Sequence, residues 1–120
     1  MRLAKRGVSL ARMKTKAAVL RQMELPRPYA ESRPLAIEEV ELDGPGENEV
    51  LVQVAGAGLC HSDLSVINGS RPRPVPMVMG HEAAGIVRDV GSGVKGLQPD
   101  DHVVFSFVPC CGGCPMCAVG

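Results

Sequence analysis

The feature that most limits how this chain can fold is a group of cysteines close together in the sequence. Four of the five cysteines form the run Cys110-Cys111-Gly-Gly-Cys114-Pro-Met-Cys117. Thiolates repeated every three residues can surround one metal ion, and the intervening glycines let the backbone turn tightly around it. The run therefore predicts a metal site and a chain path that bends around that site.

The spacing alone leaves the identity of the metal open. A Cys-x2-Cys-x2-Cys run also begins the pattern of bacterial iron–sulfur proteins, which continues with three residues and then Cys-Pro. Here Cys117 is followed only by Ala118, Val119 and Gly120. A structural zinc ion takes four ligands, so the three regularly spaced thiolates are one short unless Cys110 contributes. From this count we expect the chain to be part of a longer protein.

A second candidate site combines Cys60 with the pair His81-Glu82, whose histidine follows twenty-one residues later. A thiolate and an imidazole are good zinc ligands, and a catalytic zinc ion usually has three protein ligands and one open position. Glu82, another loop or further sequence would supply the third ligand. The alternative is that Cys60 is a small apolar core residue and His81 a hydrogen-bonded core histidine.

Most of the remaining sequence has the pattern of short β-strands separated by turns. Aromatic residues are scarce, so the core must consist of Val, Leu, Ile, Met and Ala. This pattern predicts a β-barrel or sandwich, with one helical turn at 62–67 and a proline-rich loop at 71–76. The expected strands are 17–20, 35–42, 50–54, 83–90 and 103–108.

The charges are balanced in number but not in position. The 13 basic residues equal the 13 acidic ones, yet seven basic residues precede Glu24, the first acid. We therefore expect residues 1–12 to be a disordered basic leader before a second possible start at Met13. The acidic remainder argues against nucleic-acid binding.

Two further observations concern cellular location. No apolar run approaches the roughly 20 residues of a membrane span, and the first residues do not resemble a secretory signal. Cysteines without an export signal indicate metal or redox chemistry rather than disulfides. We expect a cytoplasmic protein without a membrane segment.

The stretch Gly91-Ser-Gly-Val-Lys-Gly96 matches the dinucleotide fingerprint G-x-G-x-x-G. That fingerprint works only where its glycines open a helix whose N-terminus meets the pyrophosphate. Pro99 and Asp100-Asp101 follow too closely for a helix to form. We interpret the stretch as a turn and expect no Rossmann domain in this chain.

Several short motifs follow one another along residues 13–120. They are Gly58-Leu-Cys-His-Ser-Asp63, Met79-Gly-His-Glu-Ala-Ala-Gly85, Val90-Gly-Ser-Gly-Val94, Asp101-His-Val-Val104 and the cysteine run. Taken in order, these motifs resemble the zinc-dependent alcohol dehydrogenases of the medium-chain dehydrogenase/reductase family. The resemblance implies a mainly β (α+β) fold, a GroES-like, partly open and incomplete β-barrel with short helical turns.

The same resemblance implies roles for the residues around Cys60 and His81. These two correspond to the first two ligands of the catalytic zinc, and Glu82 to a neighbouring carboxylate that can approach the metal. Asp63 corresponds to an acid that orients a zinc ligand through a hydrogen bond.

The resemblance also implies a proton pathway and a second zinc site. Ser62 corresponds to the hydroxyl that relays the alcohol proton, and His61 to a residue that contacts cofactor phosphate or extends the relay. The structural-zinc ligands implied are Cys111, Cys114 and Cys117, which are three of the family's four.

The implied function is interconversion of alcohols with aldehydes or ketones, with zinc as Lewis acid and NAD or NADP as hydride acceptor. The resemblance further implies a homo-oligomer, a dimer or tetramer. Because the third catalytic ligand and the nucleotide-binding domain are expected beyond this sequence, we expect the chain alone to be inactive. Two alternatives stay open, an iron–sulfur electron-transfer protein and a non-catalytic, metal-stabilised β module.

Overall fold

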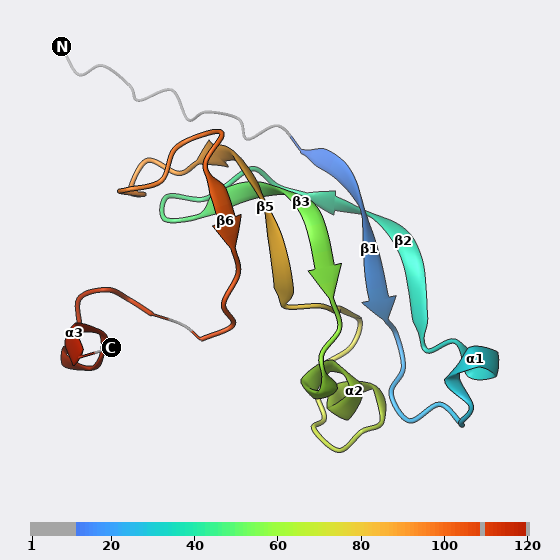
Figure 1. The fold of residues 1–120 in the computed structure, drawn as a ribbon. Helices are drawn as coiled ribbons and strands as arrows, with labels where there is room; N and C mark the ends of the chain where they lie inside the picture. Colours follow the sequence, from blue (N-terminus) through green and yellow to red (C-terminus); the bar gives the residue numbers. More distant parts are fainter. Residues whose placement is uncertain (1–11, 109, 120) are drawn as a thin grey trace, which may run out of the picture.

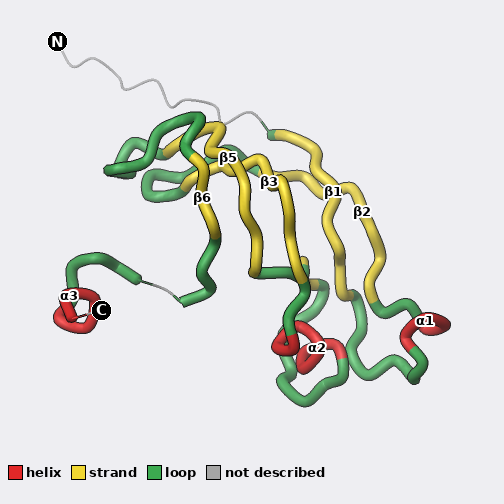
Figure 2. The backbone as a smooth tube through the Cα atoms, in the orientation of Figure 1, coloured by secondary structure: helices red, strands yellow, loops and turns green. Residues whose placement is uncertain are grey.

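The computed structural model describes residues 12–108 and 110–119. Within these residues the chain forms two three-stranded antiparallel sheets and three short helices (Figure 1, Figure 2). The elements are β1 (Met13–Leu20), α1 (Tyr29–Ser32), β2 (Leu35–Leu42), β3 (Val50–Gly58), α2 (His61–Ile67), β4 (Met77–Val78), β5 (Glu82–Val90), β6 (His102–Val104) and α3 (Pro115–Val119).

The first sheet has the strand order β2-β1-β4. β1 and β2 pair without interruption from Met13 opposite Leu42 to Leu20 opposite Leu35. Basic side chains of β1 meet acidic ones of β2 across this pair, for example Lys14 Nζ and Glu39 Oε1 at 2.7 Å. The excess of basic residues at the start of the sequence is thus partly matched by the acids of β2.

Arg12, just before β1, also contacts acidic residues on and after β2. Its guanidinium lies 3.1 Å from a carboxylate oxygen of Asp43 and 3.4 Å from one of Glu41. We expected Arg12 to end a disordered leader, whereas the structure gives it two acidic partners on β2 and the turn that follows. Residues 1–11, the rest of the expected leader, lie outside the described residues.

The second sheet has the order β3-β5-β6. β3 and β5 pair from Val50 opposite Val90 to Gly58 opposite Glu82, with irregularities that shift the register twice. The sheets are open, and among the described strands they do not close into a barrel. The expected mainly β class is confirmed. In place of one partly open barrel, the described strands form two separate open sheets.

A small aliphatic core ties the first sheet to α2. Leu20 at the end of β1 packs with Val66 and Ile67 of α2 and with Met79. Because α2 begins directly after Cys60 and Met79 lies two residues before His81, this core fixes both segments that carry candidate ligands. Met23, Tyr29, Leu35 and Met77 pack around it.

Several expectations about the elements are confirmed, and three strands differ from their expected bounds by more than one residue. Those expected at 17–20 and 50–54 are longer, as Met13–Leu20 and Val50–Gly58. The strand at 35–42 and the helix at 62–67 form as expected, and 71–76 is not helical. The strand expected at 103–108 ends at Val104. The N–H of Phe105 still donates to the carbonyl of Ala83, but the register leaves only Ser106 opposite Glu82, the first residue of β5, and 107–108 lie beyond its end.

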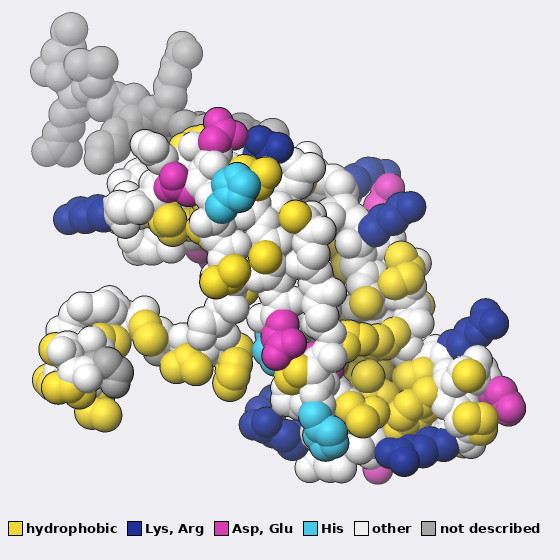
Figure 3. Space-filling view, viewed as in Figure 1, with side chains coloured by type: hydrophobic (Ala, Val, Ile, Leu, Met, Phe, Trp, Pro, Cys, Tyr) yellow, Lys and Arg dark blue, Asp and Glu magenta, His cyan; other side chains and the backbone are white. Residues whose placement is uncertain are grey.

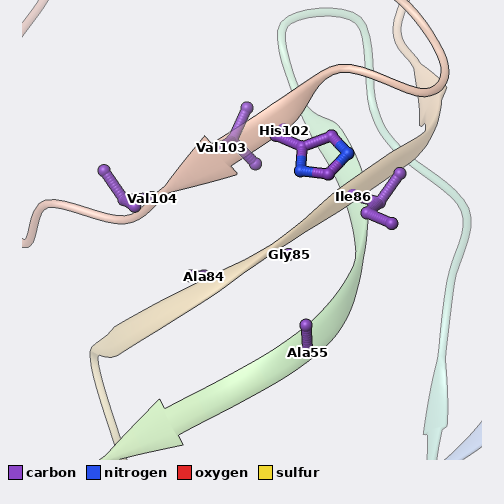
Figure 4. A pocket seen from close by; sticks show the side chains of 7 residues that line it. All are labelled: Ala55, Ala84, Gly85, Ile86, His102, Val103 and Val104. Atoms are coloured by element: carbon purple, nitrogen blue, oxygen red, sulfur yellow. The ribbon is translucent and has the colours of Figure 1, made fainter.

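Apolar side chains remain exposed on the second sheet and beyond it. Figure 3 shows hydrophobic side chains in the segment that leads to α3 and on α3 itself. Across 12–108 and 110–119 no helix is long and apolar enough to cross a membrane. A shallow apolar hollow opens over the second sheet, lined by Ala55, Ala84, Gly85, Ile86, His102, Val103 and Val104 (Figure 4).

Candidate functional site

The first candidate site is a close triangle of side chains from two separate segments. The sulfur of Cys60 lies 2.7 Å from Ser62 Oγ and 3.1 Å from His81 Nε2, and Ser62 Oγ lies 3.2 Å from the same ring nitrogen. Three polar atoms therefore converge on one point. The structure thus brings together Cys60, Ser62 and His81, which were predicted from sequence to share one site.

The local sequence explains how Cys60 is held. It is the N-cap of α2, with its sulfur 3.3 Å from the backbone nitrogen of Ser62 and its own N–H donating to Asp63 Oδ2 at 2.9 Å. The sulfur also accepts from the backbone N–H of Asp63, the third helical residue, so Cys60 and Asp63 form a capping box and satisfy each other's backbone donors. The helix start therefore fixes the position of the thiol.

Asp63 connects the two halves of the site. Its side chain is buried, and the residue is only 4% exposed. One carboxylate oxygen accepts from the N–H of Cys60, and the other lies 3.3 Å from both Gly80 N and His81 Nδ1. A carboxylate on Nδ1 fixes the ring orientation and leaves Nε2 free to bind a metal, which is the usual partner arrangement of a zinc-binding histidine.

The chemistry of the donor set fits zinc. A thiolate, an imidazole nitrogen and a carboxylate can be supplied by Cys60, His81 and Glu82, whose ligand atoms all lie within 4.8 Å of one another. Thiolate, imidazole and carboxylate are the three protein ligand types of zinc. The exposed carboxylate of Glu82 stands at the start of β5, directly after His81.

The electrostatics of the pair favour charged forms. The pKa of Cys60 is lowered, chiefly because the Ser62 hydroxyl and then the Ser62 backbone N–H stabilise its thiolate. Burial alone would lower the pKa of His81, but the negative charges of Asp63 and Cys60 and their hydrogen bonds outweigh burial and raise it. Both pKa shifts therefore act in the same direction, towards the charged form of each side chain.

Two residues of this site were not found from the sequence. Gly80 adopts a left-handed backbone (φ 97°), which glycine tolerates, and donates its N–H towards Asp63. Phe107 is 74% exposed and stacks edge-on against the His81 ring, with centroids 5.4 Å apart. The scarcity of aromatic residues was the one sequence signal that could have drawn attention to Phe107.

The side chain of His61, unlike those of the other predicted residues of this site, has no described contact with the triangle or with Asp63. His61 is exposed and is the first residue of α2. Its carbonyl accepts a hydrogen bond from the hydroxyl of Ser65. This position gives its ring access to solvent beside the site.

The second candidate site is formed by the cysteine run. Cys117 Sγ lies 3.4 Å from Cys114 Sγ and 3.9 Å from Cys111 Sγ, and the three sulfurs form one potential ligand group. Gly112 has a left-handed φ of 72°, which lets the chain turn back. The hydrogen bond with Cys114 is the main cause that lowers the pKa of Cys117.

Cys110 is not a member of this group. Among the described residues, the cluster that could hold an ion contains Cys111, Cys114 and Cys117 and leaves out the exposed Cys110. The idea that Cys110 supplies a fourth ligand therefore gains no support from the geometry.

The apolar hollow and the glycine stretch do not belong to either site. None of the seven residues that line the hollow belongs to the two ligand groups. The stretch 91–96 forms turns between β5 and β6 and opens no helix, as expected. In the described part of the chain the stretch therefore lacks the helix that a G-x-G-x-x-G fingerprint opens.

A match to a known protein family covers more than half of the chain. The profile of the alcohol dehydrogenase GroES-like domain matches residues 46–120, which contain both candidate sites. The chain belongs to this family. The GroES-like fold expected from the sequence is thereby confirmed.

Individual relatives agree with this assignment. The chain is 52% identical over 108 residues to the NDMA-dependent alcohol dehydrogenase of Amycolatopsis methanolica. It superposes on an alcohol dehydrogenase zinc-binding domain protein from Burkholderia ambifaria with a TM-score of 0.78, at 40% identity over 91% of this chain and 27% of that protein. A cobalt- and zinc-bound thermostable alcohol dehydrogenase from Pyrobaculum aerophilum gives a TM-score of 0.70 at 33% identity, covering 90% of this chain and 31% of that one.

The coverage of these matches is unequal. The Amycolatopsis comparison includes 90% of this chain but 27% of the relative. The GroES-like chain thus spans about a quarter of the relatives' length. The relatives are dehydrogenases, so the iron–sulfur alternative is not favoured.

Proposed function

We propose that this chain is the zinc-binding N-terminal part of an alcohol dehydrogenase that interconverts alcohols with aldehydes or ketones. The observation that carries the proposal is the convergence of Cys60 Sγ, Ser62 Oγ and His81 Nε2 within 3.2 Å of one another. Two of these atoms are zinc ligands by type, and the third is a hydroxyl that can pass a proton.

Different residues of the chain would bind the catalytic zinc and hold its ligands in position. Cys60 and His81 would hold the catalytic zinc, with Glu82 near enough to approach it. Asp63 keeps both ligands in place through its contacts with Cys60 N and His81 Nδ1. When bound, zinc supplies Lewis-acid polarisation of the substrate oxygen.

Ser62 would take the proton released by the alcohol. A hydroxyl both donates and accepts hydrogen bonds, so it can receive a proton on one side and release one on the other. The exposed His61, the preceding residue in the chain, would extend this path to solvent or contact cofactor phosphate.

The described residues do not fit a nicotinamide dinucleotide by themselves, because no glycine turn in them opens a helix after a strand. NAD or NADP therefore belongs to the function proposed for the intact protein. Cys111, Cys114 and Cys117 would hold a second, structural zinc.

The finer features of the intact protein are part of the same proposal. The substrate would be a small alcohol or aldehyde, and the protein a cytoplasmic homo-oligomer, a dimer or tetramer. Free thiols at all five cysteines suit a reducing compartment. Nucleic acid and membrane are not among the proposed partners.

Cobalt titration of the metal-stripped chain tests the two sites. Cobalt can replace zinc at thiolate sites and gives a thiolate-to-metal absorption that counts occupied sites. Two equivalents are expected, one for each ligand group. Cys60→Ser should lose one equivalent, Cys117→Ser the other, and the matched control Cys110→Ser neither.

Two results would argue for the alternatives. Equal cobalt uptake by the wild type and Cys60→Ser would favour a β module in which Cys60 is only a core residue. A brown preparation containing acid-labile sulfide would indicate an iron–sulfur protein.

A further inference from the structure

We propose that Cys114 and Cys117 are a redox modification site, which a hydroperoxide converts into a reversible disulfide that excludes metal from the cysteine run. This goes beyond the metal-binding role given to these thiols above. Only the exclusion of metal rests on the proposed function, because the disulfide itself requires no metal.

The geometry selects this pair of thiols. Cys114 Sγ and Cys117 Sγ are 3.4 Å apart, while Cys111 Sγ lies 3.9 Å from Cys117 Sγ. A disulfide needs its sulfurs about 2 Å apart, so the closer pair requires the smaller movement. Cys111-Gly-Gly-Cys114 and Cys114-Pro-Met-Cys117 both have the two-residue spacing used by dithiol redox proteins, so the short sulfur separation, and not the spacing, selects Cys114 and Cys117.

The surrounding structure allows that movement. α3 has five residues, none of them buried, and lies at the end of a loop that leads away from β6 (Figure 1). The carbonyl of Cys114 accepts a hydrogen bond from the N–H of Ala118, which keeps the two cysteines on one helical turn. Closing the bond therefore moves two half-buried side chains without disturbing the apolar core.

Access for a small oxidant is also present. Cys110 and Cys111 are exposed, and Cys114 and Cys117 are partly exposed. A hydroperoxide is small enough to reach partly exposed sulfurs. Cys60 is partly exposed as well, but the described neighbours of its sulfur are Ser62 and His81 and not a second thiol with which it could form a disulfide.

The reaction balances with the hydroperoxide as the only added reagent. The sulfur of Cys117 attacks the peroxide oxygen, the O–O bond breaks, and a sulfenic acid and one water (or alcohol) form. The thiol of Cys114 then attacks the sulfenic sulfur, forming the S–S bond and releasing a second water. Two thiols are oxidised by two electrons, and the peroxide is reduced by two.

The disulfide and a metal ion compete for the same sulfur atoms. Oxidation removes two of the three thiolates that the cluster offers. A single remaining thiolate from Cys111 cannot hold zinc in its usual four-ligand site. Bound zinc should in turn protect both thiols, because their lone pairs are then directed at the metal.

Mass spectrometry of the 120-residue chain tests the inference directly. The metal-stripped chain is treated with stoichiometric hydrogen peroxide, its remaining thiols are alkylated, and peptides containing 110–119 are sequenced. The expected product lacks two hydrogens, carries label on Cys110 and Cys111 but not on Cys114 or Cys117, and returns to the dithiol with dithiothreitol. A parallel sample loaded with zinc before peroxide should keep all four thiols.

Cysteine variants distinguish a wrong assignment of the disulfide from a wrong assignment of the metal site. Cys110→Ser should oxidise as the wild type does, whereas Cys114→Ser should stop at the sulfenic acid, trapped by a dimedone-type reagent. A first product that is a sulfinic acid, or a disulfide involving Cys110 or Cys111, would overturn the inference. A Cys114–Cys117 disulfide that forms equally fast with and without zinc would contradict the proposed metal site, and with it the exclusion of metal, but not the disulfide.

Discussion

Asp63 is the residue on which the two ligand-bearing segments depend. Its buried carboxylate caps α2 through Cys60 and lies beside Gly80 N and His81 Nδ1. A carboxylate behind a histidine ligand both fixes the ring and increases its basicity. One side chain thus links a helix N-terminus to the turn that carries the second ligand.

Removing the charge of Asp63 should weaken metal binding without emptying its position. Asp63→Asn keeps one oxygen, enough for one of the two backbone N–H groups that now meet different carboxylate oxygens, and it loses the negative charge beside His81. We expect zinc affinity at the Cys60 site to fall by about 10–100-fold. Competition with a chromogenic chelator measures the change.

A matched control is Asp100→Asn, which alters an exposed carboxylate paired with Arg88. It should leave zinc affinity unchanged. If Asp63→Asn also binds zinc as the wild type does, Asp63 is only a helix cap.

The sequence predicted which site residues belong together, because ligand type and spacing are local properties. Cys60, His81 and Glu82 do approach one another, as expected from the resemblance. Phe107 was missed, because its contact with His81 depends on how the chain returns after β6. No sequence pattern encodes that return.

At the scale of elements, β3 and β5 lie unusually close at one glycine. A Cβ added to Gly85 would overlap the carbonyl oxygen of Gln53 and crowd a methyl group of Val52. Gly85→Ala should therefore force the strands apart and destabilise the fold by about 1–3 kcal/mol. Urea unfolding of the chain measures this loss.

Gly56, on β3 of the same sheet, is the matched control. A Cβ there meets no atom within 4 Å. Gly56→Ala should leave the unfolding midpoint close to that of the wild type. Equal midpoints for both variants would show that the close approach at Gly85 does not limit stability.

The α3 segment should depend on its thiols for order. None of its five residues is fully buried, and an isolated helix of this length is not stable in water. Removing metal should increase amide hydrogen exchange in 110–119 while β1 and β2 stay protected. Uniform protection before and after a chelator would contradict this dependence.

Elements differed in how far the sequence could predict them. The strand at 35–42 is long enough to show a pattern and was predicted at its observed bounds. α1, β4 and α3 have four, two and five residues, which is too short for a hydrophobic period to be visible. β6 was predicted too long because the apolar run continues to Val108, whereas the pairing with β5 ends at Val104 opposite Ala84.

At the scale of the whole molecule, the GroES-like chain provides ligands but no described nucleotide-binding unit. Its second sheet exposes apolar residues around an open hollow, and its first sheet holds the small core beneath the site. The relatives are dehydrogenases of which it spans about a quarter. We therefore expect the chain alone to bind metal without catalysing alcohol oxidation.

The 120-residue chain, loaded with zinc, should bind metal yet show no NAD- or NADP-dependent oxidation of alcohols. Hydride transfer requires the cofactor held at about 3–3.5 Å from the substrate carbon, and the described residues offer no fold for that cofactor. The measurement is nicotinamide absorbance with a panel of primary and secondary alcohols. Turnover by the chain alone would contradict the proposed division of roles.

A chimera tests whether the chain supports catalysis when the rest of a dehydrogenase is present. In this chimera, residues 13–120 of the chain replace the matching part of the Amycolatopsis dehydrogenase, to which the chain is 52% identical. The chimera should be an active alcohol dehydrogenase if the ligands act as proposed. The same chimera carrying Cys60→Ser should lose activity, whereas Cys110→Ser should retain it, because only the first removes an atom from the triangle with Ser62 and His81. Equal activity of the two variants would mean that Cys60 does not hold the catalytic metal.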